Sequence, residues 1–173
     1  MGLLHGPAEY AAITRVGPRL FLSGAPGRED AERLRALGVT GILSVARECG
    51  DEWAAYEPGL HLVHFGFRDH EPLPAALAVA TVRTLAALLA EGPTLVHCGI
   101  GVSRSPTFVA LYLWATRQAR SHPEAVARLR RLRPCVAPNA IVDEAVLAAV
   151  ARLRGEWGRG VNGGRRRARR ETA

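Results

Sequence analysis

The chain has 173 residues, of which 48% are hydrophobic and 23% are charged, a composition typical of one soluble domain with a hydrophobic core. It contains no apolar run of about 18 residues and no charged start followed by a long apolar segment. A membrane span and a secretory signal are therefore not expected. We expect a cytoplasmic protein. The net charge of +7 comes from arginine alone, since the chain has no lysine.

The expected strands and helices alternate along the chain. Short apolar runs predict strands at residues 19–24, 39–46, 60–67 and 93–98. Helical periodicity, with proline or glycine at several of the ends, predicts helices at residues 29–38, 74–92, 105–119, 123–133 and 139–154. This alternation indicates an α/β fold of three layers, in which helices flank a central, mainly parallel sheet.

Composition divides the chain after Arg154. Residues 7–154 carry the expected elements and predict one compact domain. Residues 155–173 are rich in glycine and contain six arginines against two glutamates, which predicts a disordered tail. The charge of this tail suits an acidic partner and equally suits a solvated extension.

One stretch, HCGIGVSRS, concentrates reactive and anion-binding groups between an expected strand and helix. Ligands of open α/β sheets bind at this edge, where amide N–H groups and the helix dipole attract anions. Cys98 supplies a thiol that such surroundings favour as thiolate, and Arg104 a planar fork for two oxygens. We expect a phosphate-like group facing the Cys98 sulfur, bound by Arg104 and by the loop residues Gly99, Ile100, Gly101, Val102 and Ser103.

Nucleophilic attack by Cys98 on that phosphate would give a thiophosphate intermediate. Ser105 follows Arg104, and its hydroxyl is placed to hydrogen-bond the thiolate and help it leave in the second step. His97 is expected to orient the loop through hydrogen bonds. No Cys/His spacing suggests a metal, and no cofactor is expected.

The string HCGIGVSRSP resembles the signature of the cysteine-dependent protein tyrosine phosphatases, and its closing SRS is similar to the dual-specificity branch. The resemblance extends to RLFLSGAPGREDAERLRALGVTGILSVA and to RRLRPCVAPNAIVDEAVL, and covers about residues 16–153. It implies that residues 7–154 are a dual-specificity phosphatase-like catalytic domain.

This resemblance also implies a general acid about thirty residues before the cysteine. Asp69 lies 29 residues before Cys98 and is the expected acid, with Glu71 and then His70 as alternatives. Asn139 is expected to brace the phosphate loop, to cap the last helix, or both.

The other two cysteines have less specific expectations. The resemblance makes Cys49 a candidate for a protective disulfide with Cys98, against the simpler interpretation of a spare thiol. Cys135 is expected to fill the core or a turn.

The expected function is metal-independent hydrolysis of phosphomonoesters on proteins, and inorganic phosphate or sulfate is expected to fit the loop. The short segment from Cys49 to Leu60 favours a shallow cleft that admits phosphoserine and phosphothreonine as well as phosphotyrosine. Alternatives are a phosphoinositide or nucleic-acid 5′-phosphatase of the same fold and a phosphate-binding pseudoenzyme. The uncharged loop disfavours a phosphoinositide or nucleic-acid 5′-phosphatase. The presence of both Cys98 and Arg104 disfavours a pseudoenzyme. A sulfurtransferase or an arsenate reductase fits less well.

Overall fold

The computed structural model describes the backbone of residues 12–49, 59–138 and 142–170, and side chains of these residues as far as residue 158. In this part of the chain five strands form one sheet in the order β1-β2-β5-β3-β4. β1 is antiparallel to β2, and all other neighbouring strands are parallel. The strands are β1 (Thr14–Arg15), β2 (Leu20–Ser23), β3 (Gly41–Ala46), β4 (His61–Phe67) and β5 (Thr94–His97).

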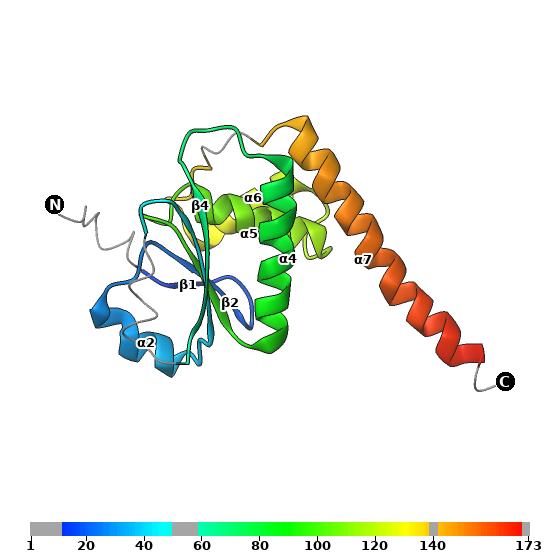
Figure 1. The fold of residues 1–173 in the computed structure, drawn as a ribbon, viewed down its shortest axis with the longest axis horizontal. Coiled ribbons are helices and arrows are strands. Elements are labelled where there is room, and N and C mark those ends of the chain that lie inside the picture. The colour runs from blue at the N-terminus through cyan, green and yellow to red at the C-terminus, as the bar shows by residue number, and fades with distance from the viewer. Residues whose placement is uncertain (1–11, 50–58, 139–141, 171–173) are drawn as a thin grey trace.

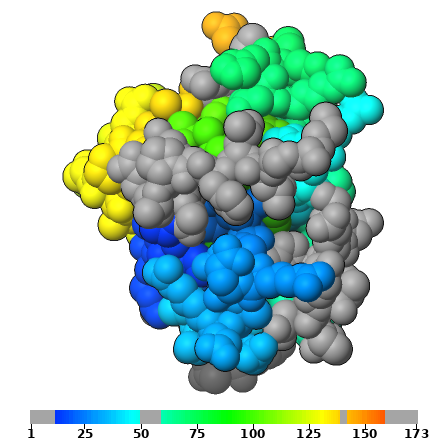
Figure 2. Space-filling view, turned by 90° about the vertical axis from the view of Figure 1, so that its left-hand side faces the viewer, coloured from blue at the N-terminus to red at the C-terminus, as the bar shows by residue number. Residues whose placement is uncertain are grey.

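Helices cover both faces of the sheet, as the sequence predicts (Figure 1). The short η1 (Arg28–Asp30) and α2 (Ala31–Ala36) lie on one face, and Figure 2 looks onto that side of the molecule, where the α2 segment belongs to the light-blue surface. The helices on the other side are α4 (Ala75–Glu91), α5 (Arg104–Ala115), α6 (His122–Leu132) and α7 (Glu144–Arg170). The three-layer α/β class is therefore confirmed.

Two hydrophobic clusters hold the layers together. The larger packs the sheet against α4, α5, α6 and α7, and the smaller packs α2 against β2, β3 and β5 through residues such as Leu34, Ile42 and Leu95. Every residue of β3 is buried, which confirms the expectation that this apolar run is covered on both faces. β5 lies in the middle of the sheet, so the segment that follows it emerges at the centre of the carboxyl edge.

Three details differ from the sequence prediction. β1 has only two residues, too few for a periodic pattern, and the sequence analysis did not predict it. β4 begins one residue later than predicted, at His61, and is an edge strand that is more exposed than β3. α5 begins one residue earlier than predicted, at Arg104, and ends at Ala115.

The last helix is longer than the sequence predicts. α7 continues as a helix to Arg170, and its end extends away from the rest of the molecule (Figure 1), where the sequence predicts disorder after Arg154. Five glycines in residues 155–164 lower the helix propensity of that stretch in water. The domain boundary, the disorder of the tail in solution and its acidic partner remain predictions. None of the helices in the described ranges has the length and apolar character of a membrane span.

Candidate active site

Residues 98–103 form a loop between β5 and α5 at the carboxyl edge of the sheet. The loop begins with Cys98, directly after the last residue of β5, and ends where Arg104 starts α5. The positive end of the α5 dipole therefore points toward the loop, as the strand-loop-helix pattern of the sequence predicts.

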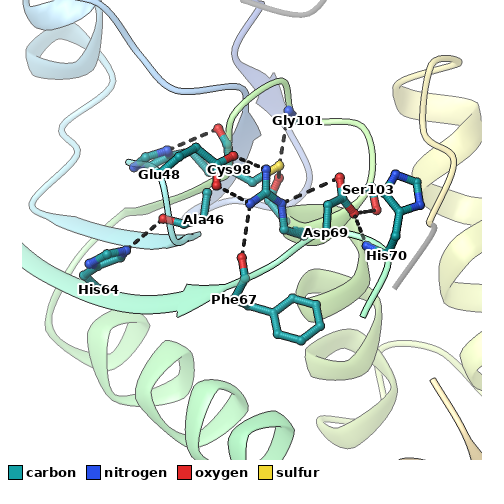
Figure 3. A network of polar contacts seen from close by, with 12 residues as sticks. Ala46, Glu48, His64, Phe67, Asp69, His70, Cys98, Gly101 and Ser103 are labelled. Carbon is teal, nitrogen blue, oxygen red and sulfur yellow. Dashed lines mark hydrogen bonds and ion pairs between the residues drawn. The ribbon is translucent and has the colours of Figure 1, made fainter. Parts of the chain in front are cut away.

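The Cys98 thiol is buried and accepts two hydrogen bonds (Figure 3). The backbone N–H of Gly101 lies 3.3 Å from Sγ, and the Ser105 hydroxyl lies 3.2 Å from it. The same hydroxyl is 3.4 Å from the carbonyl oxygen of Ser23, so it can donate to either acceptor. Both donors suit a sulfur that carries negative charge, because an anion gains more from such hydrogen bonds than a neutral thiol does.

The carbonyl oxygens of the loop are held from outside the loop. Of the four from Gly99 to Val102, Ala25 N–H donates to the Gly99 oxygen and Ala137 N–H donates to the Val102 oxygen, each at 2.9 Å. Arg133 holds the two between them, with Nη2 3.4 Å from the Ile100 oxygen and Nε 3.0 Å from the Gly101 oxygen. In a trans peptide the N–H group points opposite to the C=O group. The loop therefore turns inward a set of N–H groups, those of Ile100, Gly101, Val102 and Ser103.

Gly101 is the residue that allows this turn. Its φ is +71°, in the left-handed region that favours glycine. A Cβ there would lie 2.4 Å from the Gly24 nitrogen and 2.5 Å from the Ser23 carbonyl carbon, both backbone atoms that cannot move aside. The loop is thus packed directly against the end of β2.

The Arg104 guanidinium is buried, and one of its two donor edges is open. Nη1 donates to Glu48 Oε2 at 2.7 Å and to the Phe67 carbonyl oxygen at 3.1 Å, and Nη2 donates to Glu48 Oε1. Nε has no hydrogen-bond partner among the described residues, although it is buried. The Nε–Nη2 edge therefore keeps two parallel N–H groups for a ligand, and this spacing fits two oxygens of a phosphate.

Glu48 was not singled out by the sequence analysis. It follows β3, the neighbour of β5, and this position at the carboxyl edge is the signal that could have found it. The hydrogen bond with Arg104 holds the pKa of its carboxyl below the usual range, against the opposing effect of burial. Glu48 thus stays ionised near neutral pH, and it fixes the guanidinium by the edge that faces away from Nε. Arg133 is the second residue that sequence reasoning missed, because one arginine among 23 basic residues carries no signal of its own.

Asp69 lies next to the loop, 3.7 Å from Arg104 Nε through Oδ2 (Figure 3). Its Oδ1 accepts from the Ser103 hydroxyl at 2.8 Å and from the His70 N–H at 3.1 Å. Glu71, the first alternative acid, instead pairs with Arg68 at 3.4 Å, and both side chains are largely exposed. His70 is exposed and has a positive φ of 61°. Among the three candidates, Asp69 is the one that contacts the loop.

His97 and Cys49 are both kept neutral by burial. The His97 side chain is buried, which lowers its pKa to about 4, and Nδ1 lies 3.4 Å from the Cys98 carbonyl oxygen. Burial, and then the charge of Glu48 and the proximity of Cys98, raise the pKa of the Cys49 thiol to about 11. Cys49, Cys98 and Cys135 are all free thiols. Asn139 and most of the short segment between Cys49 and Leu60 lie outside the described residues.

A cavity of about 450 Å³ opens beside the loop, lined by Arg47, Glu48, Arg68, Asp69 and Arg104. Arg104 and Asp69 thus line the same cavity. A loop of inward N–H groups, a buried sulfur and an arginine with a free edge together form a site for a tetrahedral anion.

The comparison with protein families agrees with this geometry. The family model for the dual specificity phosphatase catalytic domain matches residues 20–147, and the chain belongs to this family. The chain is 34% identical to human dual specificity protein phosphatase 13B over 108 residues, which cover 58% of the chain and 54% of that protein. It is 31% identical to rat dual specificity protein phosphatase 5 over 142 residues, covering 80% of the chain but only 36% of the relative. The chain thus spans about half or less of the length of these relatives.

Solved structures share the fold. Human DUSP28 superposes with a TM-score of 0.64 at 26% identity, over 84% of this chain and 95% of that one. PTPMT1 in complex with PI(5)P gives a TM-score of 0.66 at 21% identity, over 83% and 95%. TpbA of P. aeruginosa in complex with pTyr gives 0.63 at 20% identity, over 84% and 94%. The last two likenesses show the fold alone.

Proposed function

We propose that this protein hydrolyses phosphomonoesters on phosphorylated proteins through a phosphocysteine intermediate at Cys98. The observation that carries the proposal is the relation between the buried sulfur and Arg104. The sulfur accepts hydrogen bonds at the floor of a loop of N–H groups, while Arg104 keeps its Nε–Nη2 edge open at the same loop. A phosphate bound to that edge and to the loop amides presents its phosphorus to the sulfur.

In the first step the Cys98 thiolate attacks phosphorus, the S–P bond forms and the bond from phosphorus to the ester oxygen breaks. Asp69 gives its proton to the leaving oxygen, which departs as an alcohol or phenol. The loop N–H groups and Arg104 stabilise the charge on the equatorial oxygens, which is greatest in the transition state.

In the second step a water molecule attacks phosphorus, and Asp69 takes the proton that the water loses. The S–P bond breaks, inorganic phosphate is released and the thiolate is restored. The Ser105 hydroxyl, at 3.2 Å, donates to the sulfur as it becomes negative and so favours its departure. His97 is neutral, so its role is to orient the loop. None of these steps calls for a metal or a cofactor.

The substrate class is part of the proposal. The family favours phosphotyrosine together with phosphoserine and phosphothreonine, and the cavity at the site is lined by polar side chains from three segments of the chain. Inorganic phosphate and sulfate fit the same loop as product and product analogue. A free catalytic thiol also requires a reducing compartment, which is consistent with a cytoplasmic protein.

A pH–rate profile on an aryl phosphate tests the mechanism. We expect a bell with an acidic optimum for the wild type and no turnover for Cys98→Ser, with Cys135→Ser as the matched control that keeps its activity. Asp69→Asn should lower kcat about a hundredfold and remove the decline on the basic side, because that decline records the loss of the acid's proton. Glu71→Gln is the control for Asp69 and should keep the bell.

Three outcomes would overturn parts of the proposal. Turnover by Cys98→Ser would exclude the phosphocysteine intermediate. A wild-type profile for Asp69→Asn, with a lost basic limb for Glu71→Gln, would transfer the acid role to Glu71. Binding of phosphopeptides without turnover would make the protein a phosphate-binding pseudoenzyme. Turnover of phosphoinositides alone would make the substrate a lipid and not a protein.

A further inference from the structure

Two arginines that the proposed mechanism does not use lie beside the candidate active site. Arg47 and Arg68 follow Ala46 and Phe67, which are paired at the ends of the adjacent strands β3 and β4. The backbone N–H of Arg47 donates to the Phe67 carbonyl oxygen at 3.2 Å, so the two chain segments remain together after the strands end. Both side chains line the cavity that contains Arg104.

The charges around these arginines are unequally compensated. Arg104 is paired with Glu48, and Arg68 has a loose ion pair with Glu71 at 3.4 Å. Arg47 makes no ion pair or side-chain hydrogen bond with any residue in the described ranges. Because Asp69 must be protonated to act as the acid, Arg47 is the surplus cation of the cavity during the first step.

A second cavity of about 340 Å³ adjoins the first, and Arg47 and Arg68 line both. Its other walls include apolar side chains and a glycine, namely Gly66, Phe67, Pro72, Pro74 and Leu77, together with Glu71. Gly66 lies directly beside Arg47, since a Cβ built on Gly66 would be in ordinary van der Waals contact with the Arg47 Cα, at 3.5 Å. The two cavities therefore form one groove, and the arginine pair stands at the boundary between the phosphate end and the adjoining cavity.

We propose that Arg47, with Arg68 beside it, forms a subsite for a second anionic group on the phosphopeptide substrate. This group is a carboxylate or phosphate on a residue next to the phosphorylated one, and the adjoining cavity takes the peptide beyond it. A guanidinium suits both anions, because each offers two oxygens to a planar pair of donors. The inference rests on the proposed function and specifies which substrates the site prefers.

A pair of phosphotyrosine peptides, identical except for Glu or Gln beside the phosphotyrosine, tests this subsite. Peptides with the variable residue on either side should be compared. The wild type should show a kcat/KM about fivefold higher for the Glu peptide on one side, the size expected of an exposed charge pair. Arg47→Gln should bring that ratio close to one, and Arg33→Gln, an equal charge change on exposed α2, should retain it. Raising the salt concentration should lower the wild-type ratio.

The outcomes separate this inference from the proposed function. Equal turnover of the Glu and Gln peptides by the wild type, or an unchanged ratio in Arg47→Gln, would overturn the subsite alone. No turnover of either peptide or of an aryl phosphate would overturn the proposed function and the subsite with it. A higher kcat/KM for phosphoinositide in mixed vesicles, lost in Arg47→Gln, would assign the second anion to a lipid headgroup and overturn the peptide assignment.

Discussion

Glu48 binds Arg104 through the two terminal nitrogens of the guanidinium and so leaves its Nε edge open toward Asp69. Among the described residues, the Nε edge itself has only Asp69 Oδ2 beside it, at 3.7 Å and without a hydrogen bond, so the Nε donor on that edge is unoccupied. On the terminal edge, the Glu48 carboxylate compensates the buried charge of Arg104 and prevents the guanidinium from rotating. Glu48 is thus a positioning residue for the phosphate-binding arginine.

Glu48→Gln should weaken inhibition by inorganic phosphate and lower kcat/KM, each by about tenfold. The physical reason is that a charge-assisted hydrogen bond to a buried arginine contributes about 1.5–3 kcal/mol. Inhibition constants and kcat/KM on an aryl phosphate measure the effect, and Glu32→Gln on exposed α2 is the control. Stronger phosphate inhibition in Glu48→Gln would mean that Glu48 competes with the ligand.

Arg133→Lys should lower kcat and phosphate affinity by about tenfold or more. Lysine keeps the charge but cannot hold the Ile100 and Gly101 oxygens with a planar fork, so the N–H groups behind them lose their orientation. The measurement is kcat together with phosphate inhibition well below the melting temperature. Arg131→Lys, two residues earlier and exposed, is the matched control. A variant that loses stability but keeps wild-type phosphate inhibition would reduce Arg133 to a purely structural role.

Gly101→Ala and Gly38→Ala separate conformational strain from steric clash. Both glycines have a positive φ, +71° and +68°, but a Cβ at Gly38 meets nothing within 4 Å. Gly38→Ala should therefore cost about 1–2 kcal/mol of unfolding free energy, the penalty of the left-handed region alone. Gly101→Ala should cost more than about 3 kcal/mol and abolish phosphate binding, since overpacking against backbone adds to that penalty. Urea unfolding and phosphate inhibition measure both effects, and equal stability losses would contradict the clash.

Alkylation of Cys49 should be slow at neutral pH and accelerate until the pH approaches 11. Its pKa is raised to about 11, so the thiol is protonated below that pH, and each unit of decrease removes about nine-tenths of the reactive thiolate. Mass spectrometry of peptides after timed iodoacetamide treatment measures the rate at each pH. The same protonation should slow a disulfide with Cys98 after peroxide treatment at pH 7 relative to pH 9. Rapid, pH-independent labelling of Cys49 would contradict its buried, neutral state.

Adjacency along the chain explains why much of the site could be predicted from sequence. Cys98, Arg104 and Ser105 belong to one loop and the first turn of one helix. The predicted strand, the glycines of the loop and the predicted start of the helix are therefore enough to place them together. Asp69 follows a predicted strand, and the parallel order brings that strand's end to the same edge. The regular elements followed from apolar periodicity in the same way.

The residues that sequence reasoning missed reach the loop from far along the chain. Glu48 lies 56 residues before Arg104, and Arg133 lies 32 residues after Gly101. Neither belongs to a local pattern, because their partners are set by the sheet order and by the packing of α6 beside α5. The open edge of Arg104 is also a matter of geometry alone, since it depends on which nitrogens Glu48 occupies.

Arg133 also donates to the Ala12 carbonyl oxygen at 2.7 Å and to the Thr14 hydroxyl at 3.2 Å. One guanidinium thereby fastens the start of β1 to the phosphate loop, although the family match begins only at residue 20. Trimming the chain to the matched segment would remove two anchors of that side chain. A shortened chain that keeps the anion pocket intact must therefore begin before residue 20, at or upstream of Ala12.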